Sequence, residues 1–230
     1  MKKIAILQSN YIPWKGYFDM INSVDEFILY DTVQYTKNDW RNRNKIQTKQ
    51  GLNWLTIPVK HESLEQKIED TKITDKKWNV KHWRTISQTY AKSKYFKEYS
   101  ALFENFYLNC EEEYLSKVNF QLIKIINKIL DIQTKVTWSS DYTLVDGQTE
   151  KLLSICEQAG ATTYLSGPAA KDYFDESLAA ERGIKIEWMN YSGYPEYQQL
   201  HQPFEHGVTV LDLIFNEGPN ATKFMKSFNK

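Results

Sequence analysis

Two short apolar runs in the first 31 residues, separated by one amphipathic segment, restrict what this chain can fold into more than any other feature. The runs span residues 4–7 and 27–30, and neither alternates apolar with polar side chains. Continuous apolar runs of this length are typical of strands buried on both faces of a parallel sheet. Between them, Pro13 fits the first turn of a helix that carries Phe18, Met20, Ile21 and Val24. The segment therefore predicts a β-α-β unit.

The alternation of strands and helices returns in the second half of the chain, after a segment with a different pattern. We predict an α/β fold with a mostly parallel, Rossmann-like sheet flanked by helices. The whole chain, residues 1–230, is predicted to form one domain with a β-hairpin and helical insertion at about 44–130. The later strands are predicted at 136–138, 163–165 and 184–189, the hairpin at 44–48 and 53–59, and helices at 75–130, 149–159 and 210–215.

Charge and cysteine content narrow the class of protein. Lys plus Arg and Asp plus Glu each number 29, so the formal net charge is zero and gives no electrostatic reason to expect a nucleic-acid or membrane binder. No apolar stretch suits a signal peptide or approaches the roughly 18 residues of a membrane helix. Cys110 and Cys156 belong to no CxxC pair, which argues against a disulfide framework or a structural zinc site. These features predict a soluble, cytoplasmic protein.

Polar side chains follow the predicted strands at the points where they end. Gln8 and Asn10 follow the first strand and Asp31 follows the second, while later strands are followed by Asp141, by Ser166 with Gly167, and by Asn190 with Tyr191. Ligands of open α/β sheets bind outside the carboxyl ends of the strands, so these groups are expected to face one crevice. Loops are polar for solvation as well, but amides beside a carboxylate favour a site. Asp31 is the candidate catalytic residue, as a proton acceptor.

Aromatic and basic residues stand next to these positions. Tyr11, Trp14 and Tyr17 follow the first strand and are suited to stack on a sugar or a base, or else to fill the core. Arg41 and Arg43, with Asn42 between them, offer fork-shaped donors for a phosphate or carboxylate, or form a solvated basic loop.

The segment from Ser166 to Pro168 is compatible with two interpretations. It opens a helix whose backbone N–H groups suit an anion, or it is simply a well-capped helix start. No metal site is predicted, because the four histidines show no paired spacing, and no nucleophile motif or Walker loop is present.

Several of these residues together resemble the signature of the WbqC-like protein family. Residues 8–18 (QSNYIPWKGYF), with Asp31, Gln34 and residues 40–44 (WRNRN), resemble its opening blocks. Residues 54–59 (WLTIPV) and 164–167 (YLSG), the latter with Lys171 and Tyr173, resemble later ones, and residues 211–216 with Gly218 and Pro219 resemble the last. Ser9 stands where many members have Pro. The resemblance adds Gln34 and Lys171 to the candidate substrate-binding residues.

The resemblance implies a role in bacterial surface-polysaccharide biosynthesis, since the family occurs in O-antigen and related gene clusters. Its suggested activity is glycine transfer, so the implied function is a transferase that attaches glycine or a similar acyl group to a nucleotide-linked amino sugar. The donor stays open between free glycine with ATP and glycyl-tRNA, and so does the cofactor.

A second resemblance is to nucleotidyltransferase-like folds. Residues 13–17 (PWKGY) are similar to their HxGH-type signature, with Trp14 and Tyr17 where those enzymes have histidines. Two alternatives to the transferase are therefore kept, a non-catalytic sugar-nucleotide binding or assembly module and a nucleotidyltransferase.

Overall fold

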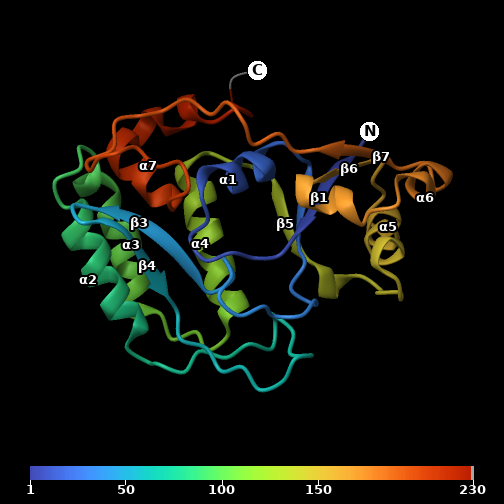
Figure 1. Cartoon of the computed structure of the whole chain (residues 1–230), viewed down its shortest axis with the longest axis horizontal. Helices are drawn as coiled ribbons and strands as arrows, with labels where there is room; N and C mark the ends of the chain where they lie inside the picture. Colours follow the sequence, from blue (N-terminus) through green and yellow to red (C-terminus); the bar gives the residue numbers. More distant parts are fainter. Residues whose placement is uncertain (229–230) are drawn as a thin grey trace.

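The structure, a computed structural model that describes residues 1–228, is built on a five-stranded parallel sheet (Figure 1). The strand order is β5-β2-β1-β6-β7, so the chain moves outward from β1 in one direction and then in the other. This doubly wound order confirms the predicted α/β fold with a Rossmann-like parallel sheet. The strands are β1 (Lys3–Leu7), β2 (Glu26–Leu29), β5 (Lys135–Trp138), β6 (Thr163–Ser166) and β7 (Lys185–Trp188).

Helices cover both faces of this sheet, as a parallel sheet buried on two sides requires. In Figure 1, α5 and α6 lie at the end of the molecule that holds β6 and β7, and α2 and α3 lie at the opposite end. The α-helices are α1 (Lys15–Asn22), α2 (Trp78–Tyr90), α3 (Phe96–Asn109), α4 (Leu115–Ile129), α5 (Gln148–Gln158), α6 (Glu176–Glu181) and α7 (Val210–Glu217). The 3-10 helices are η1 (Ser139–Asp141), η2 (Pro168–Asp172) and η3 (Gly218–Phe224).

Alternate residues of the central strands face two separate cores, because side chains along a strand point to opposite faces. Ala5, Phe27 and Leu165 are register partners and belong to one buried cluster, which we call the cap-side core. Its other members include buried side chains of α1, α2, α3, α4 and α7. Ile4 and Ile28 point the other way into the far-side core, which they form with buried side chains of α5 and α6.

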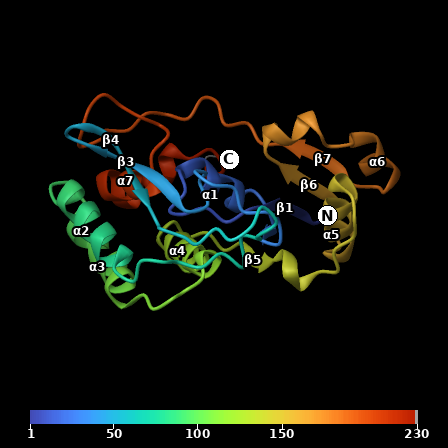
Figure 2. The same cartoon turned by 60° about the horizontal axis from the view of Figure 1, so that its bottom comes forward.

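The segment between β2 and β5 adds a two-stranded antiparallel sheet and three helices. We call residues 43–129 the cap segment; it contains β3 (Arg43–Thr48), β4 (Gly51–Thr56), α2, α3 and α4. The predicted hairpin is confirmed, although β4 begins at Gly51, whose φ of 103° suits a glycine. Figure 2 shows the hairpin beside α7 and away from α5 and α6. The cap segment therefore packs over one face of the parallel sheet only.

Two helix starts differ from the sequence prediction. Helix α1 begins at Lys15, two residues after Pro13, and ends before Val24. The reason is the loop after β1, where Ile12 has a φ of 36° and turns the chain before the helix starts. The helix predicted after Gly167 is the five-residue η2, with Pro168 at its first position. A 3-10 helix this short provides little of the dipole that an anion site would use.

Candidate functional site

A cavity of about 540 Å³ opens beyond the carboxyl end of β1, where four loops meet. We call it the central pocket. The loop after β1, the loop before β3, the loop after β7 and the loop before α7 each contribute to its wall. It is lined by Asn10, Pro13, Trp14, Trp40, Asn44, Tyr191, Ser192, Gly193, Tyr194, His206 and Gly207.

The loop after β1 is held in a strained conformation by the hairpin. Ile12 is fully buried at a φ of 36°, an uncommon value for a β-branched residue. The Asn44 Nδ2 group donates to the carbonyl oxygens of Tyr11 and Ile12, at 3.1 and 3.0 Å. The Val210 amide donates to the Pro13 carbonyl oxygen at 2.9 Å, and the Thr209 amide to that of Lys45, also at 2.9 Å. Three loops of the pocket are thus fixed to one another before any ligand arrives.

One wall of the pocket is aromatic. The Trp14 ring lies 5.3 Å from the Tyr191 ring and 5.6 Å from the Tyr194 ring, measured between centroids. Gly16 makes this arrangement possible, because a β-carbon there would lie 2.3 Å from the Trp14 indole. The Tyr194 hydroxyl donates to the buried Asp19 carboxylate at 2.5 Å and fixes the ring. Such a wall suits the apolar face of a sugar or a planar ring.

A buried lysine lies behind this wall. The Lys15 Nζ donates to the Pro195 carbonyl oxygen at 3.0 Å, and the side chain is 3% exposed. The ammonium lies 5.3 Å from the Tyr194 ring centroid and 5.1 Å from that of Tyr197. Burial lowers the pKa of Lys15 to about 8, against the opposing effect of nearby carboxylates such as Asp19. The wall is therefore backed by a positive charge in a poorly solvated place.

His206 is the histidine of the pocket lining. Its ring packs edge-on against Phe204, with centroids 4.6 Å apart, and its buried Nδ1 has no hydrogen-bond partner among residues 1–228. Burial lowers the pKa of His206, and the Lys15 charge lowers it further. The imidazole is therefore neutral at pH 7 and can accept a proton.

Of the candidate substrate-binding residues, Asn10 and Trp14 line the central pocket, and so does Tyr191, which was expected to face the same crevice. Arg41 reaches it through Asn10, since its guanidinium donates to the Asn10 Oδ1 and also pairs with Asp39 at 3.5 Å. The Arg41 side chain is 14% exposed. Arg43 lies outside the pocket on the hairpin, over the Trp54 ring. Asn10 and Trp14 are thus part of the pocket wall, Arg41 contacts that wall through Asn10, and Arg43 lies outside it.

Asp31 is enclosed where β2 ends. The side chain is 1% exposed; its Oδ1 accepts the Ser9 amide at 2.8 Å and its Oδ2 the Ser116 hydroxyl at 2.5 Å. Burial raises the pKa of Asp31, while the hydrogen bonds from Ser116 and Ser9 oppose the rise. Because Ser116 belongs to α4, the carboxylate ties the loop after β1 to the cap segment. These contacts support a positioning role, and the catalytic role of Asp31 stays a prediction.

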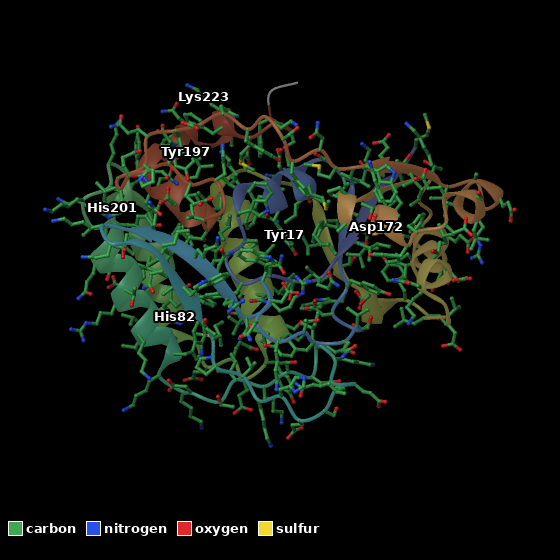
Figure 3. All side chains as sticks on the ribbon, viewed as in Figure 1. Tyr17, His82, Asp172, Tyr197, His201 and Lys223 are labelled. Atoms are coloured by element: carbon green, nitrogen blue, oxygen red, sulfur yellow. The ribbon has the colours of Figure 1, made fainter. Side chains whose placement is uncertain are left out.

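Tyr11 and Tyr17 are enclosed in the cap-side core, 0% and 2% exposed. The Tyr11 hydroxyl bonds to His82 Nδ1 at 2.8 Å and to the Tyr107 hydroxyl at 2.7 Å. His82 Nε2 donates to a backbone carbonyl oxygen, so its Nδ1 accepts from Tyr11. The Tyr17 hydroxyl donates to the Gln8 carbonyl oxygen at 3.0 Å. Figure 3 shows Tyr17 near the middle of the molecule, with His82 on α2.

The remaining predicted residues lie elsewhere. The Ser166 hydroxyl donates to the Tyr164 hydroxyl at 3.2 Å, at the edge of the far-side core, and Gly167 follows it into η2. Lys171 lies over Trp188, 5.6 Å from the ring centroid.

Asn42 donates to the Ile57 carbonyl oxygen, and Gln34 pairs with Lys67 in an isolated bridge. Of Asn10, Asp31 and Ser166, Asn10 alone is among the lining residues of the central pocket. In Figure 3, Asp172 of η2 lies on the opposite side of Tyr17 from His82.

Sequence reasoning missed most of the pocket lining. Tyr191, three residues after the end of β7, was expected to face the crevice because it follows a predicted strand. Tyr194, His206 and Gly207 lie in the segment between β7 and α7, which forms neither helix nor strand. No periodicity marks such a segment, and only its neighbours in space identify it as part of a site.

Residues 1–228 contain no group of three or more His, Cys, Asp or Glu side chains placed to hold a metal ion. No helix among them is long and apolar enough to cross a membrane. Both cysteine thiols are free, with Cys156 buried and Cys110 half-buried.

The chain matches a protein family and a protein of known sequence over nearly its whole length. The family model described as the WbqC-like protein family matches residues 8–224. The uncharacterized protein Rv1507c of Mycobacterium tuberculosis (strain ATCC 25618 / H37Rv) is 47% identical over 227 residues, which cover 98% of each chain. No solved structure matches this chain.

Proposed function

Because this chain belongs to the WbqC-like protein family, we propose that it is a transferase of bacterial surface-polysaccharide biosynthesis. It would attach glycine or a similar acyl group to the amine of a nucleotide-linked amino sugar. The observation that carries the proposal is the central pocket, in which an aromatic wall meets an amide and a neutral histidine.

The lining suits a sugar amine. Trp14 and Tyr191 offer a face for the ring carbons, and Asn10 offers hydrogen bonds that fix the orientation of the hydroxyl groups. The Arg41 guanidinium beside Asn10 orients that amide and keeps further donors for a carboxylate or phosphate. Much of the rate enhancement of such a reaction can come from holding the amine against the acyl carbon.

The reaction requires a proton acceptor, and His206 is suited to the role. The sugar amine forms a bond to the acyl carbon of an activated donor, and the bond from that carbon to its leaving oxygen breaks. The electron pair departs with the leaving oxygen, and the surplus proton of the amine passes to the His206 imidazole. A neutral imidazole at pH 7 is a better acceptor than a carboxylate with both oxygens engaged, as in Asp31.

The direct test is an acylation assay followed by mass spectrometry. Purified protein is incubated with nucleotide-linked amino sugars and with either glycine plus ATP or glycyl-tRNA, and the sugar is examined for an added glycyl group. His206→Gln is expected to lower turnover about 100-fold with little change in sugar-nucleotide affinity. His201→Gln is the matched control, because His201 lies outside the pocket lining and its contact with the Thr89 carbonyl oxygen is long, at 3.4 Å.

The Asp31→Asn variant distinguishes a catalytic role of Asp31 from a positioning role. As a proton acceptor, Asp31 would be needed for turnover and not for affinity, whereas as a positioning residue its loss lowers stability and affinity together. Binding of the sugar nucleotide without any acylation, with either donor, would contradict the transferase and favour a binding module. Release of pyrophosphate from ATP with transfer of the adenylyl group of ATP to the sugar substrate would favour a nucleotidyltransferase.

A further inference from the structure

The outward face of the hairpin carries an exposed pair of tryptophans with two cations. Along β3, Asn44 and Ile46 point into the core, so Arg43 and Lys45 point out. Trp54 is the register partner of Lys45 on β4. Trp40 and Trp54 are 40% and 41% exposed. We call Trp40, Arg43, Lys45 and Trp54 the hairpin platform.

These four side chains form one continuous surface. The Trp40 and Trp54 ring centroids lie 5.4 Å apart at an interplanar angle of 38°. The Arg43 guanidinium carbon lies 4.3 Å from the Trp54 centroid. The Lys45 Nζ lies 5.7 Å from the Trp40 centroid and 5.5 Å from that of Trp54. Exposed aromatic rings beside positive charges are the combination that binds a base together with its phosphates.

The platform is continuous with the central pocket. Trp40 belongs to both, and the Lys45 Nζ lies 3.9 Å from the place that a β-carbon on Gly207 would occupy. Gly207 is part of the pocket lining, and the Lys45 carbonyl oxygen accepts the Thr209 amide. Lys45 is therefore the cation between the platform and the pocket. A negatively charged linkage that joins a group on the platform to a group in the pocket would pass beside it.

Arg43 has donors to spare for such a linkage. One terminal nitrogen donates to the Asn38 carbonyl oxygen and Nε is buried without a hydrogen-bond partner among residues 1–228, so the remaining terminal N–H groups are the donors left for a ligand. A guanidinium has five N–H donors in a fork that matches two phosphate oxygens. A neutral oligosaccharide would use the tryptophans and leave both cations without a role, so the charges favour a phosphorylated ligand.

We propose that the hairpin platform binds a nucleoside diphosphate, with the base on Trp40 and Trp54 and the diphosphate between Arg43 and Lys45. The group attached to the diphosphate then enters the central pocket. This assignment rests on the proposed function, because it orients a nucleotide-linked sugar with its sugar next to Trp14 and His206.

The test is isothermal titration calorimetry of the full chain with ADP, CDP, GDP and UDP in turn, with inorganic pyrophosphate and a C-C-A ribotrinucleotide as further ligands. Trp54→Leu and Arg43→Gln are each expected to weaken binding of the preferred diphosphate about 10-fold. Trp138→Leu and Lys117→Gln are matched controls, because Lys117 lies 4.2 Å from the Trp138 ring centroid, away from the pocket lining. Thermal melts establish that each variant is folded.

The outcomes separate this assignment from the proposed function. Weaker binding in the two platform variants and unchanged binding in the two controls supports the platform, whatever the acylation assay gives. Acylation and diphosphate binding that persist unchanged in both platform variants overturn the platform and leave the transferase standing. Failure of all four diphosphates to bind more tightly than pyrophosphate overturns it, as does tighter binding of the trinucleotide.

Discussion

The two faces of the parallel sheet are buried by different kinds of interior. The far-side core is formed by apolar side chains with one buried carboxylate, Glu26, beside it, and each of its helices follows a strand after a short 3-10 helix. The cap-side core encloses several separate hydrogen-bonded sets of polar groups, such as Tyr11 with His82, Asp31 with Ser116, and Asp212 with Tyr90. The pocket lies on the cap side. An apolar interior stabilises the sheet, whereas fixed polar contacts also specify where each loop must lie.

Truncation of one side chain in each core gives the largest expected effects. Phe215 of α7 packs against three aromatic rings, including Phe103, and Leu153 of α5 is fully buried in the far-side core. Phe215→Ala and Leu153→Ala are each expected to lower the free energy of unfolding by about 3 to 4 kcal/mol, measured in urea. Only Phe215→Ala should speed hydrogen exchange at the Thr209 and Val210 amides that close the pocket. Equal acceleration in both variants would break the distinction between the two cores.

Acid should lower the free energy of unfolding through groups on both sides of the sheet, in a different pH range for each side. On the cap side, burial lowers the pKa of His82 to about 4, from about 6.5 in an unfolded chain. Between these values the unfolded chain binds a proton that the native protein excludes, so stability falls as the pH drops from 6.5 to 4. The loss is expected to reach about 3 kcal/mol at most.

On the far side, the titrating group is Glu26. Burial raises its pKa, but hydrogen bonds from Lys2, Thr137, Lys135 and Tyr142 outweigh burial and lower the pKa to about 2, from about 4.5. Its contribution is present above pH 4.5 and is lost as the pH falls towards 2. Urea unfolding of His82→Gln should lack the first decline, and that of Glu26→Gln the second. A single decline shared by both variants would contradict this assignment.

The smallest expected effects come from two glycines with positive φ, one on each side. Gly160, which ends α5, has a φ of 67°, and Gly51 of the hairpin has a φ of 103°. Neither has a neighbour within 4 Å of an added β-carbon, so an alanine would add backbone strain alone. Each Gly→Ala change is expected to cost about 1 kcal/mol by thermal melts. Gly51→Ala should also weaken diphosphate binding slightly, and an effect of Gly160→Ala on that binding would count against the comparison.

The sequence predicted the sheet better than it predicted the pocket, for a physical reason. Buried parallel strands are apolar on both faces, so residues 4–7 and 27–30 stand out in one dimension. Helix α4 likewise carries its apolar stripe at helical spacing. The packing of the hairpin over the loop after β1 depends on contacts between distant segments, such as that of Asn44 with Ile12.

For the site, the sequence showed the chemical type of each side chain but not whether the fold would bury it. Asn10 and Trp14 were predicted because they follow a strand end. Asp31 follows a strand end too, yet α4 closes over it through Ser116. His206 lies in a segment without regular structure, where spacing to His201 carries no meaning until the fold brings Lys15 and Phe204 beside it.

The positive φ of Ile12 has a consequence for binding kinetics. A loop held in an unfavourable backbone conformation by two hydrogen bonds from Asn44 does not fluctuate among many alternatives. We expect the ligand to meet a loop that keeps this conformation on binding, so that no slow isomerisation precedes or follows the encounter. In stopped-flow experiments, the observed association rate should rise in proportion to ligand concentration without reaching a plateau. Asn44→Ala, which releases the loop, should introduce a plateau.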